Sequence, residues 1–217
     1  MEEKTMTDLN YDPAHQTIGY IVRHGELNID SRWDGWGRYV LSPEGRQAAE
    51  RAGQWLCYEK IGRIIASDLP RTYQTAEIIM GMTHVACPYL ATDPNLRSWN
   101  IGEFTGKEKT PERRAQLQHY RDNPNEIVPG GESWNSLFQR VQVAFQYLCT
   151  PYDGKITVLV SHNSVLKALI GLDERGDIIE DGGIVRVDMD EKGDLQFVAV
   201  LGATPLDKKV GIDSSCG

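Results

Sequence analysis

Thr17-Ile18-Gly19-Tyr20-Ile21-Val22-Arg23-His24-Gly25-Glu26 is a short apolar run, rich in β-branched residues, that stops at an arginine, a histidine and a glycine. Such a run predicts a buried strand whose end delivers a guanidinium and an imidazole to the carboxyl edge of a sheet. In open α/β sheets, ligands bind at that edge. The alternative is a surface turn that happens to contain two basic residues, because an Arg-His-Gly triplet alone is a weak signal.

The residue types at this strand end suit phosphoryl chemistry. A neutral imidazole such as that of His24 can attack phosphorus when one ring nitrogen is held by a hydrogen bond and the other is free. The guanidinium of Arg23 can grip phosphoryl oxygens as a planar fork. Gly25 lets the backbone approach a ligand closely.

Two further strands are predicted to end at basic side chains. The run from Ile61 to Ser67 is followed at once by a helix from Pro70, so Arg71 lies in the first turn of that helix. An arginine there opposes the helix dipole and needs another reason to be present. The clearest strand of the sequence, Ile156 to Ser161, ends at His162, before another helix.

Two arginines and two histidines converging on one crevice suit a dianionic phosphoryl group. Metal binding is the rival interpretation for the histidines. Neighbouring arginines would repel a cation, however, and no carboxylate or cysteine completes a ligand set. We therefore expect no metal site, and we take Arg23, His24, Arg71 and His162 as candidate catalytic residues.

Other periodic segments complete an α/β pattern. Ser42-Pro43-Glu44 supplies an N-cap, a proline at the first helical position and an acid in the first turn. Helical spacing predicts helices at about 43–58, 70–82, 133–150 and 162–172. Further strands are predicted at 84–89, 183–189 and 195–201, the last two as a hairpin.

Two segments near the predicted site have two interpretations each. Trp33 and Trp36, in the loop from Leu27 to Leu41, could stack on a substrate, although packing the loop down is the simpler explanation. The segment from Lys107 to Arg121 concentrates basic residues in an acidic chain and could draw a phosphorylated substrate to the site. Interleaved glutamates favour instead a solvated helix with salt bridges.

Composition narrows the class of protein. The 217 residues, 40% hydrophobic and 25% charged, suit a single domain over residues 1–217, with loosely ordered tails at 1–16 and 203–217. A formal net charge of −8 argues against nucleic acid as a partner. The four cysteines form no C-x-x-C pair, which is typical of free thiols in a reducing compartment. Without a signal peptide or a membrane-length apolar run, we expect a cytoplasmic protein with no membrane partner.

Five motifs follow one another along the chain: Arg23-His24-Gly25-Glu26, Leu41-Ser42-Pro43-Glu44-Gly45, Ser67-Asp68-Leu69-Pro70-Arg71-Thr72-Tyr73-Gln74-Thr75-Ala76, Gly131-Glu132-Ser133 and Val160-Ser161-His162-Asn163. In order and spacing they resemble the histidine phosphatase superfamily, the phosphoglycerate mutase-like proteins. The resemblance implies a three-layer α/β/α sandwich with a mostly parallel central sheet, a phosphohistidine intermediate, and neither metal nor cofactor. It also implies His24 as the nucleophile, with the transferring phosphoryl group held by Arg23, Arg71, His162 and the backbone N–H of Asn163.

The chain departs from the family pattern where a glutamate usually donates a proton. Leu96-Arg97-Ser98 places a serine there, and a serine hydroxyl is a poor acid. Glu103 is the candidate substitute, with a solvated loop glutamate as the alternative. The threonine or serine usual two places after the glycine is Leu27, and the usual asparagine falls at Asp30, for which Asn28 could compensate by a register shift. The expected substrate-binding residues are Asn28, Asp30, Ser98 and Asn163.

These residues predict a metal-independent phosphatase that hydrolyses a phosphorylated small molecule through a phosphohistidine on His24, with a weakened or relocated general acid. Without that acid, substrates with good leaving groups, such as acyl phosphates, become favoured. The alternatives are a pseudophosphatase that binds phospho-ligands without chemistry and a phosphoglycerate mutase-type phosphotransferase. The free edge of the terminal hairpin could pair with a second copy as a homodimer.

Overall fold

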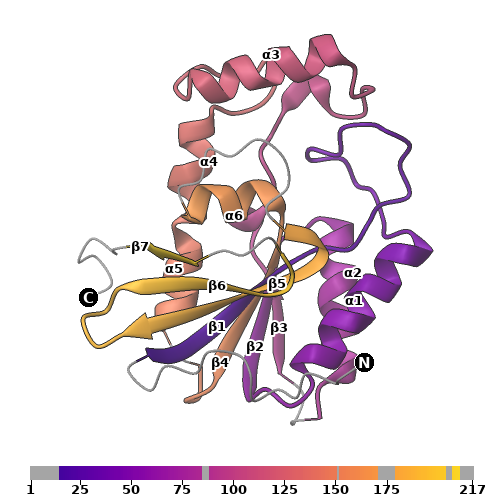
Figure 1. Cartoon of the computed structure of the whole chain (residues 1–217). Helices are drawn as coiled ribbons and strands as arrows, with labels where there is room; N and C mark the ends of the chain where they lie inside the picture. The colour runs from indigo at the N-terminus through magenta and orange to yellow at the C-terminus, as the bar shows by residue number, and fades with distance from the viewer. Residues whose placement is uncertain (1–14, 85–87, 151, 171–178, 204–206, 211–217) are drawn as a thin grey trace.

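The computed structural model describes residues 15–84, 88–150, 152–170, 179–203 and 207–210. Within them lies a seven-stranded sheet in the order β3-β2-β4-β1-β5-β6-β7 (Figure 1). The first four strands in this order are parallel to one another. Beyond β1, each further strand is antiparallel to the one before it: β5 pairs with β1, β6 with β5 and β7 with β6. The strands are β1 His15–Arg23, β2 Ile61–Ala66, β3 Tyr89–Thr92, β4 Ile156–Ser161, β5 Ile179–Asp190, β6 Leu195–Ala203 and β7 Asp207–Val210.

Successive side chains of β1 point to opposite faces of the sheet, and each face is covered by helices. Tyr20 and Val22 belong to a buried cluster that includes residues of α1 and α2, whereas Ile21 belongs to a second cluster with residues of α4, α5 and α6. The predicted three-layer α/β/α sandwich is confirmed. The helices are α1 Pro43–Leu56, α2 Pro70–Met82, α3 Pro111–Asp122, α4 Trp134–Val141, α5 Val143–Cys149 and α6 Asn163–Ile170, with short 3₁₀ turns η2 Pro94–Leu96 and η3 Gly102–Phe104.

The predicted starts of α1 and α4 are confirmed, and each has a side-chain cap. The Ser42 hydroxyl accepts a hydrogen bond from the Gly45 backbone N–H at 2.9 Å at the start of α1. At the start of α4, the Ser133 hydroxyl accepts from the Ser136 N–H at 3.1 Å. The single helix predicted over 133–150 is wrong in one respect, because it divides into α4 and α5 at Gln142. Gln142 keeps helical dihedral angles, so the break is local.

The sequence also misplaced elements at the sheet edges. The strand predicted at 84–89 is wrong, since β3 begins at Tyr89 and pairs in parallel with Arg63 to Ala66 of β2. Residues 85–87 lie outside the described part of the chain. Residues 207–210, within the tail that we expected to be loosely ordered, form β7 on the outer edge of β6.

The order β2-β4-β1 brings the three predicted strand ends together. The backbone N–H of His24 donates to the Ser161 carbonyl at 3.0 Å, and the N–H of Ser67 donates to the Val160 carbonyl at 3.1 Å. Figure 1 shows α3 beyond this end of the sheet, past α4 and α6. Of the helices that the structure describes, none combines the length and apolar character needed to cross a bilayer.

Candidate active site

His24 follows β1 directly and is fixed by its own neighbour. Its Nδ1 lies 2.8 Å from the Gly25 carbonyl oxygen, which can only accept a hydrogen bond. Nδ1 therefore carries the proton, and Nε2 keeps its lone pair. The two imidazole rings of His24 and His162 lie with their centroids 5.0 Å apart at an interplanar angle of 64°. The ring that the sequence predicted as a nucleophile is thus oriented with one nitrogen occupied and the other available.

The surroundings of His24 keep it neutral. Burial lowers the pKa of His24 to about 3, and the positive charges of Arg71 and Arg23 act in the same direction. A neutral imidazole is the nucleophilic form. The same arginines that could bind an anion therefore also keep the histidine in its reactive state at neutral pH.

His162 lies between β4 and α6 and faces Ser67 from the neighbouring strand end. Its Nε2 lies 2.9 Å from the Ser67 hydroxyl, and its buried Nδ1 has no hydrogen-bond partner among the described residues. Burial and the charge of Arg71 hold the pKa of His162 well below its usual range. The ring is therefore neutral in the anion-free site, and a negative charge beside it would favour protonation.

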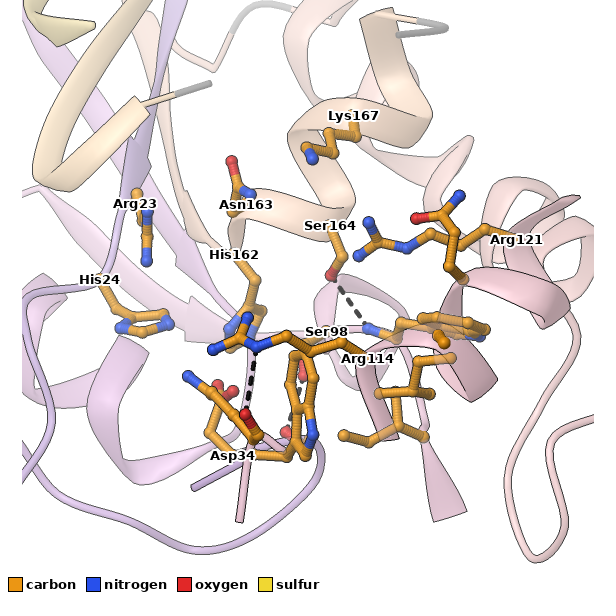
Figure 2. Close-up of a pocket in the computed structure, with 18 residues that line it drawn as sticks. Arg23, His24, Asp34, Ser98, Arg114, Arg121, His162, Asn163, Ser164 and Lys167 are labelled. Atoms are coloured by element: carbon orange, nitrogen blue, oxygen red, sulfur yellow. Dashed lines mark hydrogen bonds between the residues drawn. The ribbon is translucent and has the colours of Figure 1, made fainter. Parts of the chain in front are cut away.

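Arg23 lines the same cavity from the end of β1. Its guanidinium forms an ion pair with Asp181 at 2.9 Å and donates to the Ile179 carbonyl at 2.6 Å. Both partners belong to the start of β5. These contacts fix the direction of the guanidinium beside His24 (Figure 2).

Arg71 differs from its predicted role. Its guanidinium is fully buried, but it does not line the cavity. It forms an ion pair with Asp34 at 3.1 Å and donates to the backbone carbonyls of Gly35 at 2.7 Å and Gly37 at 3.0 Å. The predicted contact with a phosphoryl group is therefore taken by the loop at 34–37, although the charge of Arg71 still lowers the pKa of both histidines.

The cavity above the two histidines measures about 830 Å³ and is strongly basic. Trp33 lies on its wall, with Lys109 Nζ 5.2 Å and the guanidinium carbon of Arg114 5.6 Å from its ring centroid. Figure 2 draws Arg23, His24 and Asp34 toward one end of the cavity and Arg121 and Lys167 toward the other. The basic residues that line it are Arg23, Lys109, Arg114, Arg121 and Lys167, together with His24 and His162.

Helix α3 therefore faces the cavity with part of its basic surface. Leu117 is the buried residue of α3, so the helix is largely solvated, as the interleaved glutamates favoured, and part of this solvated surface lines the cavity. Arg114, Gln118 and Arg121 line the cavity, whereas Arg113 does not line it and donates to the Glu108 carbonyl. The spacing of four and then three residues was a readable signal, because it places these three side chains on one side of a helix.

Three predicted site residues lie elsewhere. Asn28, Asp30 and Glu103 are exposed and do not line the cavity. Asn28 and Asp30 flank an isolated turn in which the Ile29 N–H donates to the Leu27 carbonyl, so this part of the loop turns outward. Glu103 lies on η3, where its backbone N–H is bonded to the Pro129 carbonyl.

The loop returns to the site at Asp34, which the sequence did not single out. Asp34 lines the cavity, as do the predicted residues Ser98 and Asn163. The Ser98 hydroxyl donates to the Gly35 carbonyl at 2.7 Å and accepts from Arg71 at 3.2 Å. Ser98 therefore supports the loop that carries Asp34.

The described residues around the cavity do not form a set of metal ligands. Among the described residues, no three histidine, cysteine, aspartate or glutamate side chains gather as ligands of an ion. Two histidines surrounded by guanidinium and ammonium groups suit an anion.

Comparison of the sequence with known proteins gives consistent matches. A model described as "Histidine phosphatase superfamily (branch 1)" matches residues 19–176. Phosphoglycerate mutase-like protein 4 of Arabidopsis thaliana is 31% identical over 179 residues, which cover 78% of this chain and 75% of the relative. The 2,3-bisphosphoglycerate-dependent phosphoglycerate mutase of Cytophaga hutchinsonii is 33% identical over 158 residues, which cover 69% of this chain and 74% of the relative.

Solved structures give the same fold. The native structure of a mycobacterial glucosyl-3-phosphoglycerate phosphatase superposes with a TM-score of 0.69 over 86% of this chain and 98% of that chain, at 21% identity. YhfR of Bacillus stearothermophilus superposes with a TM-score of 0.69 over 85% of this chain and 96% of that chain, at 26% identity. The first likeness supports the fold alone.

Proposed function

This chain belongs to the histidine phosphatase superfamily, and from that premise we propose that it is a phosphatase that hydrolyses a phosphorylated small molecule through a phosphohistidine on His24. Superfamily membership covers both phosphatases and mutases, so the choice depends on the site of this chain. One observation carries the proposal: a buried neutral imidazole, with Nδ1 donating to the Gly25 carbonyl, lies at one end of a basic cavity.

The first step forms one bond and breaks another. The lone pair of His24 Nε2 attacks phosphorus, the bond between phosphorus and the leaving oxygen breaks, and that oxygen takes up a proton. Arg23 and a His162 protonated in the presence of the anion stabilise the charge on the phosphoryl oxygens. Arg71 stays bound to the loop at 34–37 and acts through its charge, which keeps both histidines neutral in the empty site. The backbone N–H of Asn163, at the start of α6, is a further donor in this proposal.

The second step returns the enzyme to its starting state. A water molecule attacks the phosphohistidine, the bond between phosphorus and nitrogen breaks, and inorganic phosphate leaves. The cavity of about 830 Å³ is much larger than a phosphoryl group, which leaves room for water beside a small substrate. Its basic lining favours phosphorylated small molecules as substrates. The buried Cys57 is a free thiol, and we propose a reducing compartment, the cytoplasm, as the place of action.

A mutase-type phosphotransferase is the second candidate. Curated relatives at 31% and 33% identity are named as phosphoglycerate mutase-like or as a mutase, which favours it. A mutase must return the phosphoryl group to a second acceptor before water reaches it. Hydrolysis and transfer therefore differ in where the phosphoryl group ends.

The test is a product assay with purified protein on a panel of phosphomonoesters that includes labelled phosphoglycerates. The proposal predicts release of inorganic phosphate, and His24→Asn should abolish it. Isomerised phosphoglycerate that forms faster than inorganic phosphate would favour the mutase. Binding of phosphate or vanadate without turnover of any ester would favour a pseudophosphatase.

A further inference from the structure

Asp34 is the acidic group of the cavity. Of the described residues that line it, Asp34 alone carries a carboxylate, among five arginine and lysine side chains and the two histidines. It lies at the same end of the cavity as Arg23 and His24 (Figure 2). The negative charge of Asp34 also acts on the nucleophile, because it raises the pKa of His24 and so opposes the lowering by burial and by the arginines. The carboxylate is therefore close to where a phosphoryl group would be transferred.

The loop that carries Asp34 is built into the site. Arg71 binds the Asp34 carboxylate and the carbonyls of Gly35 and Gly37, all within 3.1 Å. The Trp36 indole N–H donates to the Ser98 carbonyl at 2.7 Å. Gly35 has φ +41°, and a Cβ there would lie 2.4 Å from the Thr105 hydroxyl oxygen, so the turn requires glycine. These contacts give Asp34 a fixed place.

We propose that Asp34 is the general acid that protonates the leaving oxygen, an inference that rests on the proposed phosphatase function. Ser98 occupies the place where a proton donor was expected, and its hydroxyl donates to the Gly35 carbonyl, next to Asp34. The serine thus holds the loop, and the loop supplies the carboxyl group. Glu103, exposed on η3, is displaced from this role.

Asp34 is ionised in the empty site, so the proton that it donates has to come from the substrate. Burial raises the pKa of the Asp34 carboxyl, but the charge of Arg71 and a backbone hydrogen bond to the carboxylate outweigh it and keep that pKa below its usual value in the empty site. Lys109 also faces the carboxylate and acts in the same direction. A phosphate monoester binds one proton with a second pKa near about 6.

The transfer balances if the substrate arrives as a monoanion. Its proton passes to the Asp34 carboxylate, since the negative charge of the bound phosphoryl group offsets the positive charges that hold the carboxyl ionised. As the ester bond breaks, the same proton passes from Asp34 to the leaving oxygen. The products are a neutral alcohol, a phosphohistidine and an ionised Asp34.

The experiment compares two aryl phosphates in the full-length enzyme. Dinitrophenyl phosphate has a leaving group that needs no proton, whereas phenyl phosphate has a poor one. Asp34→Asn should lower kcat on phenyl phosphate by about 10²-fold or more and change kcat on dinitrophenyl phosphate by less than about 10-fold. It should also remove the fall in kcat on phenyl phosphate that loss of the monoanion causes as the pH rises above about 6. The asparagine keeps an oxygen for Arg71, so the loop contacts are largely retained.

Two variants serve as controls. Asp153→Asn changes an exposed aspartate in the turn before β4, at the opposite end of the sheet, and its φ of +54° suits asparagine. It should leave both rates unchanged. Glu103→Gln tests the competing carboxylate and should do the same.

The results separate the inference from the proposed function. Equal losses on both substrates in Asp34→Asn would overturn the acid role, because they indicate a group that only positions Arg71. A selective loss on phenyl phosphate in Glu103→Gln would assign the acid to Glu103 and also overturn it. Wild-type protein inactive on both esters would refute the phosphatase itself, and the inference with it.

Discussion

Lowering the pH from neutral should destabilise this protein through its two buried histidines. His24 and His162 are 5% and 2% exposed, and burial lowers the pKa of both. In the unfolded chain a histidine takes up a proton near pH 6.5. Because the folded pKa is the lower one, the unfolded state binds more protons below that pH. The free energy of unfolding therefore falls as the pH falls.

The size of the effect follows from the two pKa values. Between pH 7 and pH 5, a histidine that protonates only when unfolded lowers the free energy of unfolding by about 2 kcal/mol. For His24 alone this is a large share of the roughly 5–15 kcal/mol that stabilises a typical domain, and His162, whose pKa burial also lowers, acts in the same direction. Asp34 and Asp68 have lowered pKa values, so their contribution to stability is lost only below about pH 5. The change in the free energy of unfolding between pH 7 and pH 5 therefore comes mainly from the histidines.

The assay is urea unfolding at several pH values between neutrality and about pH 5. His24→Asn removes one of the two groups, so its free energy of unfolding should fall with pH by about 2 kcal/mol less than that of the wild type. Saturating inorganic phosphate should also flatten the curve, because a bound anion favours protonated His162. Wild-type stability that stays constant over this range, or a His24→Asn variant that falls as steeply as the wild type, would refute the reasoning.

Three further changes test the site and its support. Arg140→Ala should lower the free energy of unfolding in urea by about 3 kcal/mol, because it leaves the Glu132 carboxylate, 15% exposed, without its paired guanidinium; a loss under about 1 kcal/mol would contradict this. Arg114→Gln should raise KM for a phosphomonoester about tenfold at low salt and leave kcat nearly unchanged, and an unaltered KM would remove Arg114 from substrate binding. Gly25→Ala should cost about 1–3 kcal/mol in thermal unfolding, since its Cβ would lie 2.1 Å from the Gly45 carbonyl oxygen; an unchanged Tm would show that this contact relaxes.

The sequence predicted the centre of the site because that centre depends on local order. Each of Arg23, His24 and His162 follows a β-branched run directly, and the carboxyl ends of neighbouring parallel strands meet at one edge of a sheet. The layers of the fold were predictable from hydrophobic periodicity, and helix starts were predictable from capping residues such as Ser42. Elements whose determinants lie within a few residues were therefore predictable.

The rest of the site depends on contacts between distant residues. Asp34 reaches the cavity because Arg71, 37 residues along the chain, and Ser98 bind the loop around it. Nothing within the segment Leu27 to Leu41 distinguishes Asp34 from Asp30, so local sequence did not separate them. β7 likewise depends on pairing with β6 and not on a strong apolar pattern of its own. Long-range hydrogen bonds and edge pairing therefore explain most of the differences.

The most direct test of the account is to find the residue that receives the phosphoryl group. Wild-type protein mixed briefly with a radiolabelled phosphomonoester should be quenched without acid, which would cleave a phosphohistidine, and then digested for peptide mass spectrometry. We predict label on His24, at the ring nitrogen Nε2, and none in His24→Asn. Label on any other residue, or steady turnover by His24→Asn, would contradict the central claim.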